Sequence, residues 1–462
     1  MVLVAVSVPP RALAALAFRP ALLIPDSFGY MAEAVHGGLG QLRPGGYPVL
    51  LRLLEPAHSL PLITALQHVL GIGAAAIVYG MLSYWGLPRW AAALAAAPTL
   101  FDPRQIALES YILPDALYGF VVIAAVAILL TKRAPRMWQG VLAGLLIAYA
   151  SLLRGNGLAL IVPVLAYLLI RRVGWRACAA ATAASTFPVL AYVSLFYSDY
   201  GKFNITNSDG FFLWARTTSF ANCALIKPSP DLVPLCPDKQ PIHAPAQVRS
   251  WSLSAVRDAR MPADYLWAVG AWWRHNAHPG INSANNALAM RFAVDAIKAQ
   301  PLDYVRVVSR DVLLTLVGTD RAQGGNALQF TAKPDLAALP SYYAADLRAY
   351  AHTTGNTHTV QPYAYFLFVY QIPVYLPGVA FLAALIVGLA GVVRNRRRFG
   401  GPCALPFAAA ALSIVLPAAL AEGLYRYAII AVPLAFLAAG LAFVRTPAKP
   451  PERARMDGVA AV

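Results

Sequence analysis

The sequence predicts an all-α protein that crosses a membrane many times. Of its 462 residues, 59% are hydrophobic and 13% are charged, and the mean hydropathy of +0.56 does not fit a soluble domain. The apolar residues fall in runs of about 15 to 28, the length that a helix needs to cross a hydrocarbon core about 30 Å thick. Membrane β-barrels have short alternating segments instead. We therefore expect a polytopic helical protein with about nine to eleven transmembrane helices.

The first apolar segment, Val2–Ile24, is an imperfect span because two adjacent prolines and Arg19 interrupt it. It is either a bent entry helix or the remainder of a longer one. Two short amphipathic helices are expected within Tyr30–Ser59, lying along the membrane surface. Six further spans are then predicted, three of them short enough to suggest helices buried in protein or lining a cavity. These spans are Leu62–Trp85, Trp90–Phe101, Tyr111–Leu130, Trp138–Leu153, Gly157–Ile170 and Ala177–Tyr197.

The second half of the chain begins with a long polar region and ends with three more spans. The polar region is predicted to be a folded loop domain, in which Val305–Leu316 is apolar enough for an interfacial helix. The last spans are expected at Tyr363–Val393, Cys403–Ala421 and Leu424–Val444. The predicted domains are thus a membrane module (1–197, with a first outer loop at 25–60), a loop domain (198–362), C-terminal membrane helices (363–445) and a basic tail (446–462).

The distribution of the basic residues indicates which side of the membrane each connection lies on. They account for the net charge of +16, and they gather in short connections at 132–136, 171–176 and 394–398 and in the tail. The positive-inside rule places these connections in the cytoplasm and argues against nucleic acid as a partner. Counting spans from them puts the other connections, and most of the acidic residues, on the outer face. The polar residues placed there, mostly at helix ends, are Asp26, Asp102, Glu109, Asp115, Glu422, Arg104, Arg154 and Arg426.

Asp26 stands out because it lies just where the first apolar segment ends. An Asp beside Pro and Ser is by itself often only a turn or a helix cap, and any one of these charges taken alone reads as a solvated loop residue. Several carboxylates and guanidiniums at the same depth of the membrane are not explained by isolated loop charges. Together they predict a polar site that holds an anionic group on arginines and a hydroxyl on a carboxylate.

The four cysteines form no metal-binding motif. Cys178 and Cys403 lie in or beside apolar segments, where a small hydrophobic side chain suffices. Cys223 and Cys236 fall in the outer region, an oxidising compartment, so they form either a disulfide that closes a small loop or two free thiols.

Five short segments resemble membrane-embedded glycosyltransferases of the C superfamily (GT-C), in particular a bacterial, actinobacterial-type branch that uses polyprenyl-phosphate sugars. They occur in the order and at the topological positions that the family shows. The segments are Pro25-Asp26-Ser27-Phe28-Gly29-Tyr30, Arg43-Pro44-Gly45-Gly46-Tyr47-Pro48, Ala107-Leu108-Glu109-Ser110-Tyr111-Ile112-Leu113-Pro114-Asp115, Leu153-Arg154-Gly155-Asn156-Gly157-Leu158 and Tyr425-Arg426-Tyr427.

The resemblance implies that Asp26 is the general base of an inverting sugar transfer. In a partly desolvated position its pKa would be modestly raised, which improves it as a base. The leaving group would be polyprenyl phosphate, so positive charge is needed to hold it. The candidates for that role are Arg104, Arg154 and Arg426.

The resemblance also assigns a supporting role to Glu109, as a residue that binds sugar hydroxyls, orients the acceptor or helps to hold Mg²⁺ or Mn²⁺. The first loop carries Asp-Ser instead of a paired acidic motif, which weakens the case for a metal. Tyr30 and Tyr47 are expected to line the substrate site, with His36 and His58 as further candidates, although amphipathic side chains are common at any membrane interface.

The predicted partners are a polyprenyl-phosphate sugar donor, a cell-envelope glycan, glycolipid or protein acceptor, and the lipid bilayer. The predicted location is the bacterial plasma membrane, with the site facing outward. A transporter or flippase of a lipid-linked or anionic substrate is the alternative, since intramembrane charges and broken helices also mark transport paths. A non-enzymatic scaffold whose outer region binds partners is a third reading.

Overall fold

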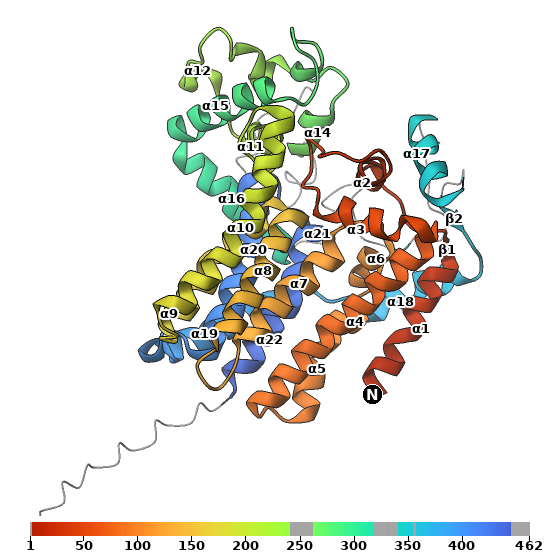
Figure 1. Ribbon diagram of the computed structural model, residues 1–462, viewed down its shortest axis with the longest axis vertical. Helices are drawn as coiled ribbons and strands as arrows, with labels where there is room; N and C mark the ends of the chain where they lie inside the picture. Colours follow the sequence, from red (N-terminus) through yellow and green to blue (C-terminus); the bar gives the residue numbers. More distant parts are fainter. Residues whose placement is uncertain (1, 241–261, 318–329, 331–340, 354–356, 445–462) are drawn as a thin grey trace, which may run out of the picture.

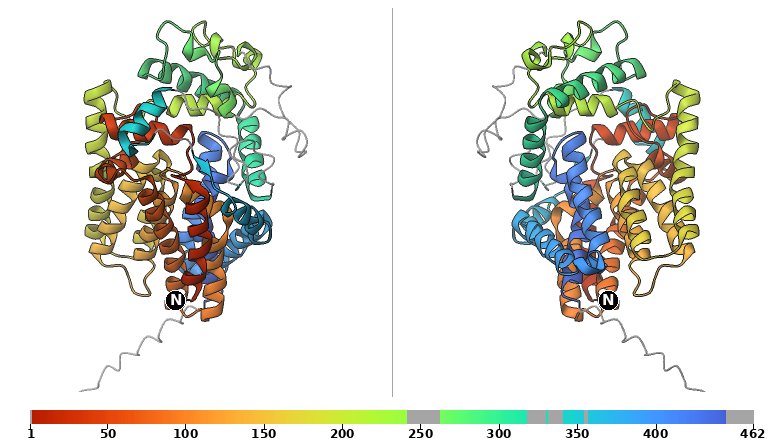
Figure 2. Two further views of the ribbon diagram at one scale, coloured as in Figure 1. Left: turned by 90° about the vertical axis from the view of Figure 1, so that its right-hand side faces the viewer. Right: turned by 90° about the vertical axis from the view of Figure 1, so that its left-hand side faces the viewer.

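The computed structural model describes residues 2–240, 262–317, 330, 341–353 and 357–444. They form a long helical bundle with a further group of helices at one end, α11 (Asp209–Thr217), α12 (Cys223–Ile226), α14 (Pro262–Trp267) and α15 (Ser283–Ala299) (Figure 1). The short helices α2 (Pro25–His36) and α3 (Gly46–Leu54) lie between the bundle and this group. Two side views show the same arrangement, with the N-terminus near the opposite end (Figure 2).

The entry segment is a helix that stops early. α1 (Val2–Ala17) contains Pro9 and Pro10 and gives way to the strand β1 (Phe18–Arg19). β1 pairs antiparallel with β2 (His358–Thr359), Phe18 opposite Thr359. The chain is therefore extended where the sequence suggested a bent helix reaching Ile24. Two short helices follow, as expected, but α2 begins at Pro25, before the predicted start of this stretch at Tyr30, and α3 begins at Gly46.

Four helical segments are long and apolar enough to cross a membrane among the described residues: Leu60–Trp85 (α4), Trp175–Tyr200 (α10), Gly401–Leu420 (ending in α20, Ala404–Leu420) and Tyr425–Ala442 (α21, Tyr425–Ala428, to α22, Val432–Ala442). α18 (Tyr363–Val374) and α19 (Gly378–Arg394) make a fifth if their 47° bend is one broken span. The polytopic helical class is confirmed, with fewer full-length spans than nine to eleven.

The difference comes from shorter apolar helices in the same bundle. They are Leu3–Ala17 in α1, Asp115–Leu129 (α7), Met137–Leu153 (α8) and Gly155–Ile170, which combines the 3-10 helix η2 (Gly155–Leu160) with α9 (Ile161–Ile170). α5 (Arg89–Phe101) is also short. Short and broken helices need protein around them in a bilayer, because lipid offers no hydrogen-bond partners.

The helix expected at Tyr111–Leu130 begins later than the sequence suggested. α6 (Pro103–Ser110) ends before it, the chain is non-helical from Tyr111 to Pro114, and α7 begins at Asp115. A proline disfavours helical backbone in the residue before it, which explains why helix cannot run through Leu113 into Pro114. The break places the Asp115 carboxylate in the first turn of α7, where the helix dipole favours negative charge.

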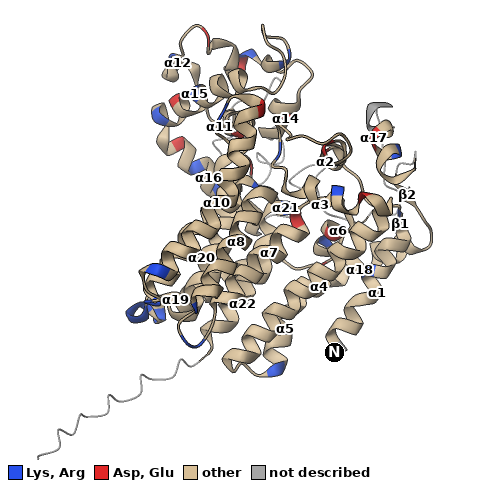
Figure 3. Cartoon of the chain, in the orientation of Figure 1, with Lys and Arg blue, Asp and Glu red and all other residues tan. Residues whose placement is uncertain are grey.

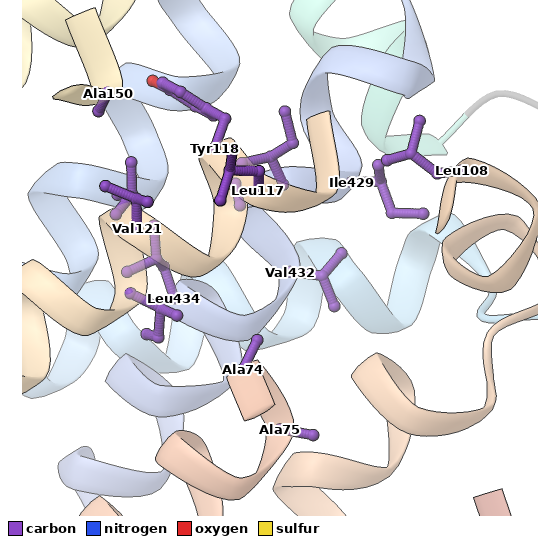
Figure 4. Packing of buried hydrophobic residues seen from close by; sticks show 14 of the residues in the cluster. Ala74, Ala75, Leu108, Leu117, Tyr118, Val121, Ala150, Ile429, Val432 and Leu434 are labelled. Atoms are coloured by element: carbon purple, nitrogen blue, oxygen red, sulfur yellow. The ribbon is translucent and has the colours of Figure 1, made fainter. Parts of the chain in front are cut away.

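Two apolar cores hold the described residues together. The larger one unites the bundle, and residues from α4, α7 and α22 meet in it, among them Ala74, Val121 and Leu434 (Figure 4). α22 comes close to α4 at Gly440, where an added Cβ would lie 2.6 Å from a methyl carbon of Leu82. The second core contains Phe211, Trp214 and Phe292 and belongs to the outer helices.

The polar region does not behave as one block. α11 (Asp209–Thr217), α12 (Cys223–Ile226), α14 (Pro262–Trp267) and α15 (Ser283–Ala299) share the second core, and α16 (Pro301–Val317) includes the expected interfacial helix. α17 (Ser341–Ala351) instead packs on α2, and β2 pairs with β1. The 198–362 segment therefore contributes two parts. One is an outer unit, made of the helices that share the second core, and the other is α17 with β2, which contacts α2 and β1. The basic tail, 446–462, lies outside the described residues.

Charge is distributed unevenly along the bundle (Figure 3). Acidic residues lie in the half that carries α2, α6 and the outer helices, whereas basic residues also gather at the ends of α9 and α19 that are away from the outer helices. The polar residues singled out in the sequence thus share one half of the molecule.

Candidate active site

Asp26 is held at the start of α2 between two arginines. Pro25 occupies the first helical turn, so Asp26 follows a residue whose backbone is already set for a helix start. Its Oδ1 accepts a hydrogen bond from Arg43 Nη2 at 2.5 Å, and its Oδ2 accepts one from Arg426 Nη1 at 3.1 Å. Arg43 comes from the loop before α3 and Arg426 from α21.

Asp115 continues this arrangement on the other side of Arg426. Its Oδ2 accepts a hydrogen bond from Arg426 Nη2 at 3.2 Å, and its Oδ1 accepts one from Arg154, which follows α8. The result is a continuous series of ion pairs, Arg43–Asp26–Arg426–Asp115–Arg154, which we call the ion-pair chain. It joins residues far apart in the sequence at the end of the bundle that faces the outer helices.

The ion-pair chain has an excess of positive charge. It contains three guanidiniums and two carboxylates, so its formal charge is +1. Arg426 Nε is buried and has no hydrogen-bond partner among the described residues. A buried cationic donor without an acceptor is costly, and an anionic ligand would relieve that cost.

Aromatic rings flank the same residues. The Tyr427 ring centroid lies 4.5 Å from Arg154 Cζ, and the Tyr30 centroid lies 5.3 Å from Arg43 Cζ. Tyr47 packs edge-on against Tyr30 at 5.2 Å, and its hydroxyl donates to Gln67 Oε1 at 2.8 Å. The structure thus places both predicted tyrosines next to the ion-pair chain, although Tyr47 is fully buried.

The pKa of Asp26 differs from the sequence-based expectation. Burial raises the pKa of this carboxyl, but the charges of Arg43 and Arg426 lower it more, and the net pKa lies below the ordinary value. The expectation of a modestly raised pKa is therefore wrong for this conformation. Asp26 is ionised at neutral pH, but guanidinium donors engage both of its oxygens.

Glu109 lies in a separate, fully buried network. Its carboxylate accepts hydrogen bonds from Arg11 Nε at 2.8 Å and from Gln105 Nε2 at 3.0 Å, and it lies 2.9 Å from His68 Nδ1. Gly71 makes room for it, because a Cβ there would lie 1.7 Å from Glu109 Oε1. This network ties α6 to α1 and α4, which favours a structural role for Glu109 over contact with substrate.

Arg104 is also engaged away from Asp26. It donates to the Asp102 carboxylate, to the Tyr375 hydroxyl at 2.9 Å and to the Leu376 carbonyl at 2.6 Å. Its Cζ lies 3.5 Å from the centroid of the Tyr425 ring. Of the three arginines proposed for the donor phosphate, the structure brings Arg154 and Arg426 together. Arg104 does not join them, but it contacts Tyr425, the residue before Arg426 in α21.

The remaining sequence candidates make contacts outside the ion-pair chain. His36 Nε2 is 2.7 Å from Asp346 of α17, and His58 stacks on His352 with centroids 3.8 Å apart, so neither belongs to the ion-pair chain. Cys223 and Cys236 form a disulfide with a Cα–Cα distance of 6.1 Å.

The ion-pair chain is not arranged to hold a divalent cation. The one metal-compatible group in the part of the chain that the structure describes is Cys223, Cys236 and Asp238, and both sulfurs belong to the disulfide. Asp26 and Asp115 direct their oxygens at guanidiniums. Neither carboxylate therefore fits Mg²⁺ or Mn²⁺ in this conformation.

Sequence reasoning left Arg43 out of the site, and it counted Asp115 among the outer polar residues without giving it a role. Arg43 stands in one of the five segments that carry the GT-C resemblance, and Asp115 is the last residue of another, so the signal was present. A lone arginine before Pro-Gly-Gly is typical of a surface turn, which hid its contact with Asp26.

One family model matches part of the chain. Residues 58–193 match the family model of dolichyl-phosphate-mannose-protein mannosyltransferases. This region includes Asp115 and Arg154 and stops short of Asp26 and Arg426. No curated protein matches the sequence.

Two solved structures resemble the chain distantly. The oligosaccharyltransferase AglB from Archaeoglobus fulgidus, in complex with an inhibitory peptide and a dolichol-phosphate, is 12% identical with a TM-score of 0.43; the match covers 95% of this chain and 49% of AglB. ArnT from Cupriavidus metallidurans, bound to undecaprenyl phosphate, is 16% identical with a TM-score of 0.36, covering 96% and 76%. This chain thus spans about half the length of AglB, and likenesses this distant do not define a function. The family match confirms the resemblance to GT-C glycosyltransferases; the bacterial branch stays a prediction.

Proposed function

We propose that this multi-pass membrane protein, similar over residues 58–193 to dolichyl-phosphate-mannose-protein mannosyltransferases, is an inverting GT-C-type glycosyltransferase. It transfers a sugar from a polyprenyl-phosphate donor to an acceptor in the cell envelope. The observation that carries the proposal is the ion-pair chain, a partly buried cluster of three arginines around two carboxylates at one end of the bundle.

Arg426 and Arg154 are the proposed phosphate-binding residues. They converge on Asp115, and Arg426 has one buried donor to spare. A guanidinium pair binds phosphate oxygens in a fixed geometry and stabilises the charge that develops as the sugar leaves. Arg104 stays a further candidate, through its contact with the neighbouring Tyr425 ring.

Asp26 is the proposed general base. The acceptor oxygen forms a bond to the anomeric carbon while the bond from that carbon to the phosphate oxygen breaks, and the bonding electrons leave with polyprenyl phosphate. The acceptor proton passes to Asp26. Attack from the face opposite the phosphate inverts the configuration, and no covalent enzyme intermediate is needed.

The resting contacts suggest how the donor would prepare this base. Arg426 bridges Asp26 and Asp115, so a phosphate that draws Arg426 toward itself would release Asp26 Oδ2. Losing one guanidinium partner raises the pKa of the Asp26 carboxyl and makes it a better proton acceptor. Base activation would thereby depend on a bound donor.

The proposed site faces the extracytoplasmic side of a bacterial plasma membrane. The basic connections at 132–136, 171–176 and 394–398 support this orientation through the positive-inside rule. The ion-pair chain lies toward the other end of the bundle, beside the outer helices.

The test is sugar transfer in membranes that contain the full chain. Decaprenyl-phosphate arabinose and decaprenyl-phosphate mannose, each radiolabelled, are offered in parallel with cell-envelope acceptors to wild type, Asp26→Asn and Asp231→Asn at equal expression. Asp231 is a control of the same residue type, since it pairs with Arg291 on the exposed outer unit. We expect transfer by wild type and Asp231→Asn and loss in Asp26→Asn. Undiminished transfer by Asp26→Asn would remove Asp26 from the role of base.

A further inference from the structure

α2 carries a second carboxylate, Glu33, on the face that presents Asp26. Positions 26, 30 and 33 are spaced four and three residues apart, so they share one side of the helix. Seven residues correspond to about 10 Å along the axis. Arg43, which binds Asp26, is also the cation that acts on Glu33.

The Glu33 carboxylate has an unmet hydrogen-bonding need. The side chain is half-buried, and Oε2 is buried with no hydrogen-bond partner among the described residues. Gly40 faces it at close range, because a Cβ at that position would lie 1.9 Å from Glu33 Oε1. A buried carboxylate oxygen without a donor costs free energy unless a ligand supplies one.

The polar groups around Glu33 are already engaged with others. On α10, the Tyr192 hydroxyl accepts from the Gly45 amide at 3.0 Å, and Tyr200 donates to the Leu39 carbonyl. Charged groups on the neighbouring elements are similarly occupied, Arg52 of α3 by the Ala34 carbonyl and Asp346 of α17 by His36.

Near neutral pH the Glu33 carboxyl can act either as a hydrogen-bond donor or as an acceptor. Burial raises the pKa of its carboxyl to about 7, against a smaller lowering by Arg43. The protonated form donates one hydrogen bond and accepts others, and the ionised form accepts only. A hydroxyl group, which both donates and accepts, satisfies either form.

We propose that Glu33 binds a hydroxyl of the acceptor, beside the hydroxyl that reacts at Asp26, and that this part of the acceptor is a neutral sugar. Two carboxylates on one face of α2 disfavour a phosphate or a carboxylate there, and the arginine between them is already paired with Asp26. This inference rests on the proposed glycosyltransferase function and deepens it by naming the chemistry of the acceptor.

The first test separates acceptor binding from the chemical step. Octyl mannoside and octyl arabinofuranoside serve as acceptors for wild type, Glu33→Ala, Glu33→Gln and the control Glu55→Ala, a half-buried glutamate just after α3. We expect Glu33→Ala to raise the acceptor KM about 10-fold or more, the loss of a charge-assisted hydrogen bond, with kcat and donor KM within about 3-fold of wild type. Glu33→Gln should recover most of the affinity, because an amide still pairs with a hydroxyl.

A structural role would give another pattern. If Glu33→Ala lowered kcat and thermal stability together, or left the acceptor KM unchanged while wild type transferred sugar, the inference would be wrong and the proposed function would stand.

A second measurement decides the case in which wild type transfers neither sugar. Carbodiimide coupling of carboxyl groups at pH 6, followed by peptide mass spectrometry, reports whether Glu33 is reachable. If the octyl glycosides protect Glu33 from coupling and do not protect Glu55, the result supports a neutral sugar site. That support does not depend on which sugar donor the protein uses. Protection by octyl phosphate alone, or by no probe, overturns it.

Discussion

Asp115→Asn is the sharpest test of the ion-pair chain, because Asp115 is fully buried and pairs with both Arg154 and Arg426. The substitution keeps the side-chain shape but raises the formal charge of the chain from +1 to +2. Breaking a buried pair by removing one partner typically costs 3–5 kcal/mol, since the remaining charge is left uncompensated. We expect the free energy of unfolding to fall by about that amount.

The same change should strengthen the response to an anionic lipid. With Asp115 neutral, Arg154 and Arg426 lack their shared carboxylate, and a phosphate can replace it. Denaturant unfolding in detergent micelles, followed by fluorescence with and without undecaprenyl phosphate, measures both effects. We expect the lipid phosphate to stabilise Asp115→Asn by more than it stabilises wild type, and to recover about half of the loss or more.

The control is Asp231→Asn, which breaks an exposed pair with Arg291. Pairs of this kind contribute about 0–1 kcal/mol, so this variant should unfold like wild type. The reasoning would be refuted if Asp115→Asn unfolded within about 1 kcal/mol of wild type. A lipid effect of equal size in both proteins would refute the assignment of the phosphate site alone.

Three other outcomes follow from the contacts described. Arg43→Gln removes a cation that lowers the pKa of Asp26, so the acidic limb of the transfer rate against pH should move to higher pH, and an unmoved limb would exclude Asp26 as its source. Glu109→Gln breaks the buried pair with Arg11, so it should lower the free energy of unfolding by about 3–5 kcal/mol, while the protein that remains folded keeps its substrate KM values. Altered KM values at unchanged stability would instead place Glu109 in the substrate site. Burial raises the pKa of Glu422 to about 7, above its ordinary 4.5. The free energy of unfolding should therefore fall by up to about 3 kcal/mol as pH rises from about 5 to 8. Glu422→Gln should remove that pH dependence, which melting curves at both pH values would check.

The helices and the polar face were accessible from the sequence because both depend on local patterns. A run such as Leu62–Trp85 has the length and composition of a span wherever it occurs, and the structure extends it by only two residues, to Leu60–Trp85. Span counting placed Asp26 and Arg426 on one face, but it did not predict that the two side chains pair. The late start of the helix expected at Tyr111–Leu130 depends on one proline, Pro114, which disfavours helical backbone in the residue before it.

The partners of individual side chains were not accessible in the same way. Glu109 and Asp26 look alike in the sequence, as acidic residues at the ends of apolar segments. What separates them is Arg11 in one case and Arg43 with Arg426 in the other. These contacts depend on how α1, α4, α6 and α21 pack, which no local pattern records.

The long reach of the ion-pair chain bears on how the protein is made. Asp26 and Arg426 are 400 residues apart, so Arg426 leaves the ribosome after every other member of the ion-pair chain. Until α21 enters the membrane, Asp26 and Asp115 lack the residue that joins them. A nascent chain therefore carries only the unconnected halves of the site. The ion-pair chain is therefore complete only after α21 has been made, and under the proposed function a shorter nascent chain could not yet use the donor.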